Sequence, residues 1–301
     1  MPKAVSDIIK GAWEALTETE RKVAHAVLAG YPLSGIGTIS ELAQKSHVSA
    51  ATITRFISRL GFPSFIAFRE AMRGEVEAQF YSPIDKQRAL STSSRTDRLG
   101  GLGLMEEVCE HIQETSRAIQ ESDFRDVVEL LADRRRRIFL VGGRLTRTVT
   151  AHLALTLHAL RQDVYSLDVS SVDSVERIAD MRPRDVLIVM DVRRYQRGAV
   201  ELARLASAKG CKIVLITDEW ISPVSVFAGT IFALMIRTDS IWDSLALPLL
   251  FGETLVNAVG LAIWPQAQRR LNEMEGYWSR WMTFDPIEEE PRKSRNGNNT
   301  A

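Results

Sequence analysis

The sequence predicts two domains of different fold class, an all-α helix-turn-helix head and an α/β body built on a doubly wound parallel sheet. Three observations predict them. Thr38–Phe68 has the pattern of two short helices joined by a tight turn. From Arg137 onward, short aliphatic runs alternate with helical segments, and a stretch rich in serine and glycine separates the two patterns. We therefore expect a head over 1–80, a flexible linker over 81–103, a body over 104–284 and a disordered tail over 285–301.

Composition limits the class of protein. A chain of 301 residues with 45% hydrophobic residues can hold two domains with real cores. Its two cysteines, Cys109 and Cys211, lie far apart, which favours a reducing compartment and argues against a disulfide or zinc framework. The N-terminus has no long apolar run, so we expect no signal peptide. The most apolar stretch, Leu245–Ile263, contains a proline, a glutamate and an asparagine, so we interpret it as a buried helix. These features predict a cytoplasmic protein without membrane contact.

The head is predicted to begin with two helices. Ser6-Asp7 can cap a short lead helix, and Thr17 with Glu20 forms a capping box for the next one. Phe65–Val76 is expected to form a further helix near the end of the head.

Between these helices lies the predicted helix-turn-helix. Thr38 and Glu41 form a capping box for its first helix, and Ser49 is a good N-cap for the second, which we call the reading helix. Gly61 is suited to end the reading helix. Ile53, Phe56, Ile57 and Leu60 fall at helical spacing and predict its buried face, and the opposite face is expected to carry Ala51, Thr52, Thr54, Arg55, Ser58 and Arg59.

This outer face is suited to DNA. Small residues allow a helix to enter the major groove, and Thr and Arg side chains donate hydrogen bonds to base edges. From Gln44 to Arg73 there are five basic residues and one acid, although the whole chain has 38 of each. Such a local basic patch favours phosphate contact. We expect groove or base-edge contacts from Ser49, Thr52, Arg55 and Arg59, and a phosphate contact from Lys45. A helix pair with no role in DNA binding is the alternative interpretation.

The linker and the start of the body follow. Residues 81–103 contain a Ser-Thr-Ser-Ser run and three glycines, and such a segment buries too little apolar area to offset its ordering entropy. Leu104–Asp133 reads as two helices, the second capped by Ser122. We interpret the run Arg134–Arg137 as a solvated helix end before a buried strand, and not as a DNA contact.

The rest of the body alternates between strands and helices. Unbroken aliphatic strands are typical of a parallel sheet that helices cover on both faces. Strands are expected at Ile138–Val141, Val164–Leu167, Val186–Met190, Lys212–Ile216 and Thr230–Met235, and helices at Thr146–Leu160, around Val172–Ile178 and at Ala199–Lys209. Ligands of such sheets bind beyond the carboxyl ends of the strands. The candidate effector-binding residues are therefore Gly142, Gly143, Arg144, Thr146, Asp191, Arg193, Arg194, Gln196, Thr217 and Asp218.

The head resembles the N-terminal domain of RpiR/MurR-type bacterial transcriptional regulators. The resemblance covers about residues 1–80 and rests on Leu16-Thr17-x-x-Glu20, Ile39-x-Glu41-Leu42-Ala43, Val48-Ser49-x-x-Thr52-Ile53-x-Arg55-Phe56 and Leu60-Gly61-Phe62. One departure lies in the turn, where Ser46 and His47 stand in place of the usual glycine.

The body resembles the sugar isomerase (SIS) domain that follows this head in the same family, with the match clearest over Asp185–Thr217. The resemblance implies a dimerising domain whose serine-rich loop holds the phosphate of a phosphosugar. Here that loop carries Asp191, Arg193, Arg194 and Gln196, and the first glycine loop reads Gly-Gly-Arg-Leu-Thr from Gly142. The phosphate cradle has therefore lost nearly all its hydroxyls and gained three arginines.

Two interpretations of these arginines remain open. In the first, Arg144, Arg193 and Arg194 clamp an anion, and Asp191 orients an arginine or a ligand hydroxyl. In the second, Arg193 and Arg194 pair with Asp191 and Asp218, fill the pocket, and leave the domain a dimerisation unit.

We predict a DNA-binding transcriptional regulator that senses a small anionic metabolite, similar to a sugar phosphate or sugar acid. The expected partners are double-stranded DNA with a near-palindromic operator, that metabolite, and further copies of the chain in a homodimer or homotetramer. The resemblance implies control of sugar catabolism genes. We expect no metal, because the five histidines do not cluster with cysteines or carboxylates at metal spacing. We also expect no cofactor and no catalytic residue, because the lysine-poor pocket loops and the absence of a His–Glu pair argue against isomerase chemistry. The alternatives are a phosphosugar isomerase-type enzyme and an SIS dimer that binds DNA without an effector.

Overall fold

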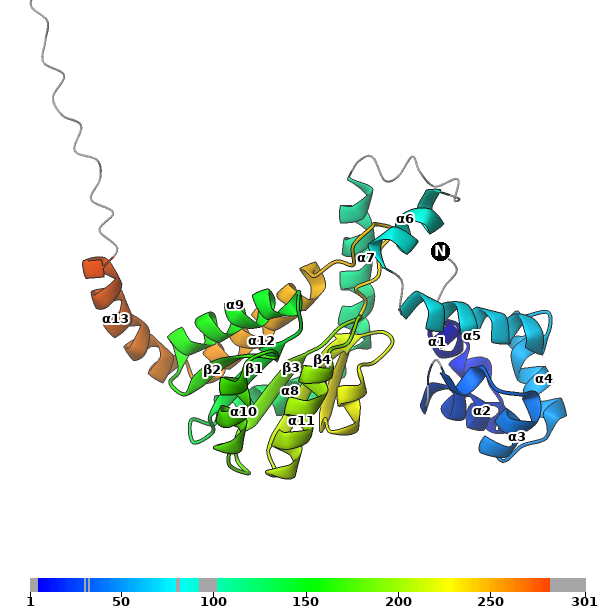
Figure 1. The fold of residues 1–301 in the computed structure, drawn as a ribbon, viewed down its shortest axis with the longest axis horizontal. Helices are drawn as coiled ribbons and strands as arrows, with labels where there is room; N and C mark the ends of the chain where they lie inside the picture. The colour runs from blue at the N-terminus through cyan, green and yellow to red at the C-terminus, as the bar shows by residue number, and fades with distance from the viewer. Residues whose placement is uncertain (1–4, 30, 32, 80–81, 92–101, 282–301) are drawn as a thin grey trace, which may run out of the picture.

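The computed structural model describes residues 5–29, 31, 33–79, 82–91 and 102–281. The expected disordered tail, residues 285–301, lies outside them, as do residues 81 and 92–101 of the expected linker. In the described parts the head is helical and the body is an α/β domain, as the sequence predicts (Figure 1).

The head packs its helices around one apolar core. Its elements are α1 (Val5–Gly11), η1 (Trp13–Ala15), α2 (Glu18–Ala29), η2 (Leu33–Gly35), α3 (Ile39–Lys45), α4 (Ala50–Arg59) and α5 (Phe65–Gln79). Both predicted capping boxes form: Thr17 pairs with Glu20, and Thr38 pairs with Glu41. The reading helix α4 buries Ile53, Phe56 and Ile57 in this core.

The turn of the helix-turn-helix has no glycine, and Ser46 and His47 give it its shape instead. Ser46 is buried, and its hydroxyl donates to the Leu42 carbonyl. His47 adopts the left-handed conformation, with φ of 53°, that glycine usually supplies. Gly61, with φ of 89°, ends α4 as predicted.

A helix lies within the segment that the sequence predicts to be a flexible linker. This helix is α6 (Pro83–Ser91), and only three residues separate it from the end of α5 at Gln79. Ser82 and Asp85 order its first turn, because the Ser82 hydroxyl accepts from the Asp85 amide and the Asp85 carboxylate accepts from the Ser82 amide. The linker prediction is therefore wrong over 83–91.

The body contains five parallel strands in the order β2-β1-β3-β4-β5. They are β1 (Ile138–Gly142), β2 (Val164–Asp168), β3 (Val186–Met190), β4 (Lys212–Asp218) and β5 (Thr230–Leu234). The helices of the body are α7 (Gly103–Ala118), α8 (Glu121–Ala132), α9 (Thr146–Leu160), α10 (Val172–Ala179), α11 (Arg197–Ala208), α12 (Ala246–Ala262) and α13 (Trp264–Trp281), with the short η4 (Pro223–Val226). Helix α8 begins at Glu121, so the prediction that Ser122 caps it is wrong.

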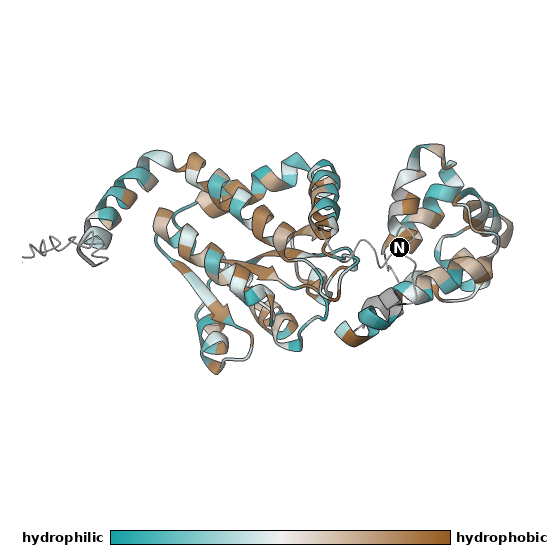
Figure 2. Ribbon diagram, turned by 90° about the horizontal axis from the view of Figure 1, so that it is seen from above, coloured by the Kyte–Doolittle hydropathy of each residue, from teal (hydrophilic) through white to brown (hydrophobic). Residues whose placement is uncertain are grey.

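Helices cover both faces of the sheet (Figure 1). Helices α8, α9 and α12 share a core with alternate strand residues such as Leu140 and Ile188. Helices α10 and α11 share a second core with the intervening residues, such as Val141 and Val189. In Figure 2 the apolar residues follow the strands and the buried sides of these helices. Strands that are buried on both faces explain why the sequence shows them as unbroken aliphatic runs.

The strand order reverses between β1 and β3, because the chain passes from β1 to β2 on one side and then returns to β3 on the other. The carboxyl ends of these two strands therefore frame a crevice of the kind that holds ligands in open α/β sheets. Within the described residues, no single helix is long and apolar enough to cross a membrane; α12 and α13 are so only when taken together, as a pair bent by 103°.

Candidate effector pocket and DNA-binding surface

A pocket opens at the reversal point of the sheet. It encloses a cavity of about 90 Å³ between the loop after β1, the loop after β3, the segment before α12 and helix α6. Six of the ten predicted effector residues line it: Gly143, Arg144, Thr146, Arg193, Arg194 and Gln196. Pro83, Lys86, Leu145, Val192, Ile241, Trp242, Asp243 and Leu245 complete the wall.

The other four predicted effector residues do not line this cavity. Gly142 is the last residue of β1. A Cβ atom there would lie 2.6 Å from the Arg147 backbone nitrogen, so glycine permits α9 to start close to the strand. Thr217 donates its hydroxyl proton to the Asp191 carbonyl at 2.8 Å. Asp191 and Asp218 are buried, and they shape the loop that carries the arginines.

The hydroxyl of Thr146 is already used inside the protein. It donates to the Met190 carbonyl at 2.6 Å and accepts from the Gly143 amide at 2.7 Å. Thr146 thus ties the loop after β1 to the end of β3. It holds the cavity wall in place and marks the start of α9, whose positive end favours an anion.

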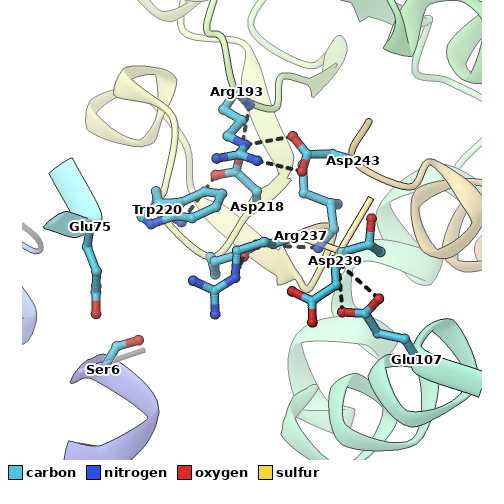
Figure 3. Close-up of polar contacts among 12 residues, drawn as sticks. Ser6, Glu75, Glu107, Arg193, Asp218, Trp220, Arg237, Asp239 and Asp243 are labelled. Carbon is cyan, nitrogen blue, oxygen red and sulfur yellow. Dashed lines mark hydrogen bonds and ion pairs between the residues drawn. The ribbon is translucent and has the colours of Figure 1, made fainter. Parts of the chain in front are cut away.

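Arg193 has a counter-ion that the sequence does not suggest. Its guanidinium binds Asp243 through two hydrogen bonds, each of 2.6 Å (Figure 3). The guanidinium carbon lies 4.4 Å from the centre of the Trp220 ring, and the side chain is 3% exposed. The same carboxylate accepts from the ammonium of Lys86 at 2.7 Å. One aspartate therefore serves two cations.

The roles predicted for Asp191 and Asp218 need correction. Asp191 accepts from the Ser222 hydroxyl at 2.6 Å and from the Gln196 amide at 3.3 Å, so it orients the loop and not an arginine. Asp218 accepts from the backbone amide of Arg193 and from the Tyr195 hydroxyl, each at 2.6 Å. Neither interpretation drawn from the sequence describes this arrangement: Arg193 is paired, but with Asp243.

Burial sets the pKa values of these carboxyl groups. It raises the pKa of Asp191 to about 6, and it also raises the pKa of Asp218. At Asp243 the effect of burial is outweighed by the hydrogen bonds and charge of Arg193 and by the charge of Lys86, which hold its pKa below the usual value. Asp243 is therefore ionised at neutral pH.

The cavity wall is strongly positive. Among the described residues it carries four cationic side chains, Lys86, Arg144, Arg193 and Arg194, and one carboxylate, Asp243. Arg144 and Arg194 are exposed at the rim, whereas Lys86 and Arg193 are buried. This excess of positive charge in a partly enclosed site is suited to an anionic ligand.

The reading helix presents only part of its predicted contact set. Ser49, the N-cap of α4, and Arg55 on α4 are exposed, and Lys45 is exposed at the end of α3. Thr52 is buried, and its hydroxyl lies 3.0 Å from that of Ser49, so its placement on the outer face is wrong. Arg59 is exposed, but it binds Glu20 at 3.2 Å and the Ala15 carbonyl at 3.0 Å, which ties α4 to the preceding helices.

Two charged residues of the cavity wall, Asp243 and Lys86, are absent from the sequence-based set. Asp243 follows β5, and the same rule that directed attention to the ends of β1, β3 and β4 would have reached it if applied to the last strand. Lys86 had no such signal, because it lies in a polar stretch far from any strand.

Comparisons with known proteins agree with both domains. Residues 3–79 match the family model of the helix-turn-helix domain of the rpiR family, and residues 130–258 match that of the SIS domain. A relative described as an uncharacterized HTH-type transcriptional regulator, from Haemophilus influenzae (strain ATCC 51907 / DSM 11121 / KW20 / Rd), is 26% identical over 225 residues, which are 73% of this chain and 76% of the relative.

Two solved structures have a similar fold. The sugar isomerase domain of an RpiR transcription factor from Sphaerobacter thermophilus matches with a TM-score of 0.54 and 20% identity, over 58% of this chain and 97% of that one. The Vibrio vulnificus NanR protein complexed with ManNAc-6P matches with a TM-score of 0.52 and 17% identity, over 93% of this chain and 99% of that one.

Proposed function

The chain is an RpiR-type transcriptional regulator, in which a helix-turn-helix domain of the rpiR family precedes an SIS domain, and from this premise we propose that it senses a small anionic metabolite in the pocket between β1 and β3. It is a regulator and not an enzyme. The observation that carries the proposal is the charge of the cavity wall, on which the described part of the chain places four cations and one carboxylate.

The chemistry of the wall favours a phosphate or carboxylate group. Arg144 and Arg194 stand at the rim with guanidinium groups that can bind such a group through paired hydrogen bonds. The similar NanR structure holds ManNAc-6P, a sugar phosphate, which supports the same class of effector here. We propose that the regulated genes serve the catabolism of the effector.

The head supplies the second half of the proposal. Ser49 at the N-cap of α4 and Arg55 on α4 contact the major groove, and Lys45 contacts a phosphate. Two copies of the head in a homodimer or homotetramer contact two half-sites of a near-palindromic operator.

The test is a titration of purified full-length protein on the DNA upstream of its own gene, at two salt concentrations, with and without a panel of sugar phosphates and sugar acids. We expect selective, salt-sensitive binding that one anion shifts. Arg55→Ala should weaken specific binding by about 1–3 kcal/mol, whereas Lys22→Ala, which removes an exposed cation of α2, should leave specificity unchanged.

The pocket is tested by two rim variants. Arg144→Gln and Arg194→Gln should weaken the effect of the anion, because each removes one guanidinium from the wall. Arg147→Gln is the matched control, since Arg147 is exposed in the first turn of α9 but does not line the cavity. Equal effects of all three variants would contradict the proposed site.

One observation favours a second candidate function, DNA binding without an effector. Arg193 already pairs with Asp243, so one buried cation of the pocket has a counter-ion without a ligand. Selective DNA binding that no anion shifts would support this second function.

A further inference from the structure

Helix α6 brings a charged side chain from the interdomain segment into the body. Lys86, on its first turn, is 4% exposed. Its ammonium donates to Asp243 Oδ1 at 2.7 Å and to the Thr238 carbonyl oxygen at 3.3 Å. Residues this far apart in sequence meet only when α6 is seated on the body, so α6 forms one wall of the cavity and is not a passive spacer.

The charges at this wall are unequal. Arg193 and Lys86 share Asp243, so two buried cations pair with the same carboxylate, and Arg193 also acts on the buried Asp218 through its charge. Glu107 on α7 also acts on Lys86 through its charge, but its own carboxylate accepts two 3.0 Å hydrogen bonds from the Asp239 amide (Figure 3). Burial lowers the pKa of Lys86, which reflects the cost of holding this ammonium out of water.

An anion in the cavity would reduce that cost. It would neutralise the excess positive charge beside Lys86 and Arg193 in a site where water screens little. It would also meet a wall that is complete only while α6 is seated, because Pro83 and Lys86 belong to that wall.

We propose that Lys86 is an effector-binding residue supplied by the interdomain helix, so that an anion in the pocket fastens α6 to the body. The proposal rests on the proposed function of the pocket. It adds that Lys86 couples binding of the anion to the position of α6, the helix that follows the DNA-binding head. By linkage, seating of α6 strengthens anion binding by the same factor as the anion strengthens seating of α6.

The test measures hydrogen exchange of backbone amides in the full-length protein. The probe is inorganic phosphate, compared with chloride at equal ionic strength. We expect phosphate to slow exchange in α6 and in the loops after β1 and β3. Lys86→Gln should remove the effect on α6 and weaken phosphate binding by about fivefold or more. Lys86→Arg should restore both, because it returns the positive charge.

Arg88→Gln is the matched control. It removes one positive charge from the same helix, but Arg88 is exposed and does not line the cavity. This variant should keep the phosphate effect on α6. If it loses the effect as Lys86→Gln does, the charge of the helix and not the seated ammonium is responsible, and the proposal is overturned.

The outcomes separate this inference from the proposed function. Slower exchange in the two loops without any change in α6 would preserve the anion site and overturn the role of Lys86. Faster exchange in α6 would mean that the anion displaces Lys86, which also overturns it. If exchange changes neither in the two loops nor in α6, the phosphate site itself is contradicted, and the coupling with it.

Discussion

A buried carboxyl group lies beneath the pocket. Asp191 is fully buried, and its carboxylate accepts from Ser222 and Gln196. Burial raises its pKa from an ordinary value of 3.8 to about 6. Asp191 therefore holds its proton in the folded protein at pH values where the unfolded chain has released it.

This shift predicts how stability depends on pH. Between about pH 4 and pH 6 the folded state binds more protons at Asp191 than the unfolded state, so the free energy of unfolding falls as pH rises through this range. The contribution is about 3 kcal/mol, fully present below pH 4 and lost above the folded pKa. Asp191→Asn should remove this part of the pH dependence, as measured by urea unfolding at several pH values. Asp173→Asn, at an exposed position of α10, should keep the wild-type slope.

For the pocket arginines, the sequence predicts their location but not the partner of Arg193. Their position after β3 predicts that Arg193 and Arg194 lie at the pocket, and both line it. The partner of Arg193 could not be derived from neighbours in sequence, because Asp243 is 50 residues away. Which carboxylate meets a buried guanidinium depends on how the segment after β5 folds back, and periodicity does not encode that path.

Among the elements, the reading helix depends on a residue with two roles. Ser49 caps α4 by accepting from the Thr52 amide at 3.3 Å, and it is also exposed on the proposed DNA-binding surface. The two roles can be separated by substitution, because aspartate also caps helices but carries a negative charge.

We expect Ser49→Ala to lower the free energy of unfolding by about 1 kcal/mol, because the orphan amide loses its acceptor. Ser49→Asp should retain that stability but weaken DNA binding, because its carboxylate would approach the phosphate backbone. Thermal unfolding and DNA titration of both variants measure the two effects. If Ser49→Asp binds DNA as tightly as wild type, Ser49 lies outside the interface.

The elements also differ in how well the sequence predicts them. The strands are found within one or two residues because burial on both faces leaves unbroken aliphatic runs. Helix α6 was missed because its sequence, Pro-Ile-Asp-Lys-Gln-Arg-Ala-Leu-Ser, has a polar composition typical of linkers. Its order depends on a tertiary contact, the seating of Lys86 on Asp243, which local propensity does not contain.

For the whole molecule, the proposed homo-oligomer predicts a geometric requirement on DNA. Two heads that share one symmetric assembly contact half-sites on the same face of the duplex. Inserting five base pairs between the half-sites turns one of them to the opposite face. We expect affinity to fall by about 10²–10⁴-fold, toward that of a single half-site, in a mobility-shift titration. Replacing the same number of central base pairs without changing the spacing is the control, and an equal loss there would point to sequence readout at the centre.

The short junction between α5 and α6 has a consequence for reach. From Gln79 to Pro83 the chain advances four residue steps, which span at most about 14 Å when fully extended. One turn of B-DNA is about 34 Å long. With α6 seated on the body, the segment that connects the head to the body is therefore shorter than half a turn of the double helix. With α6 released, the connection comprises the whole segment from α5 to α7. Occupancy of a small pocket would therefore set how far the head can reach from the body.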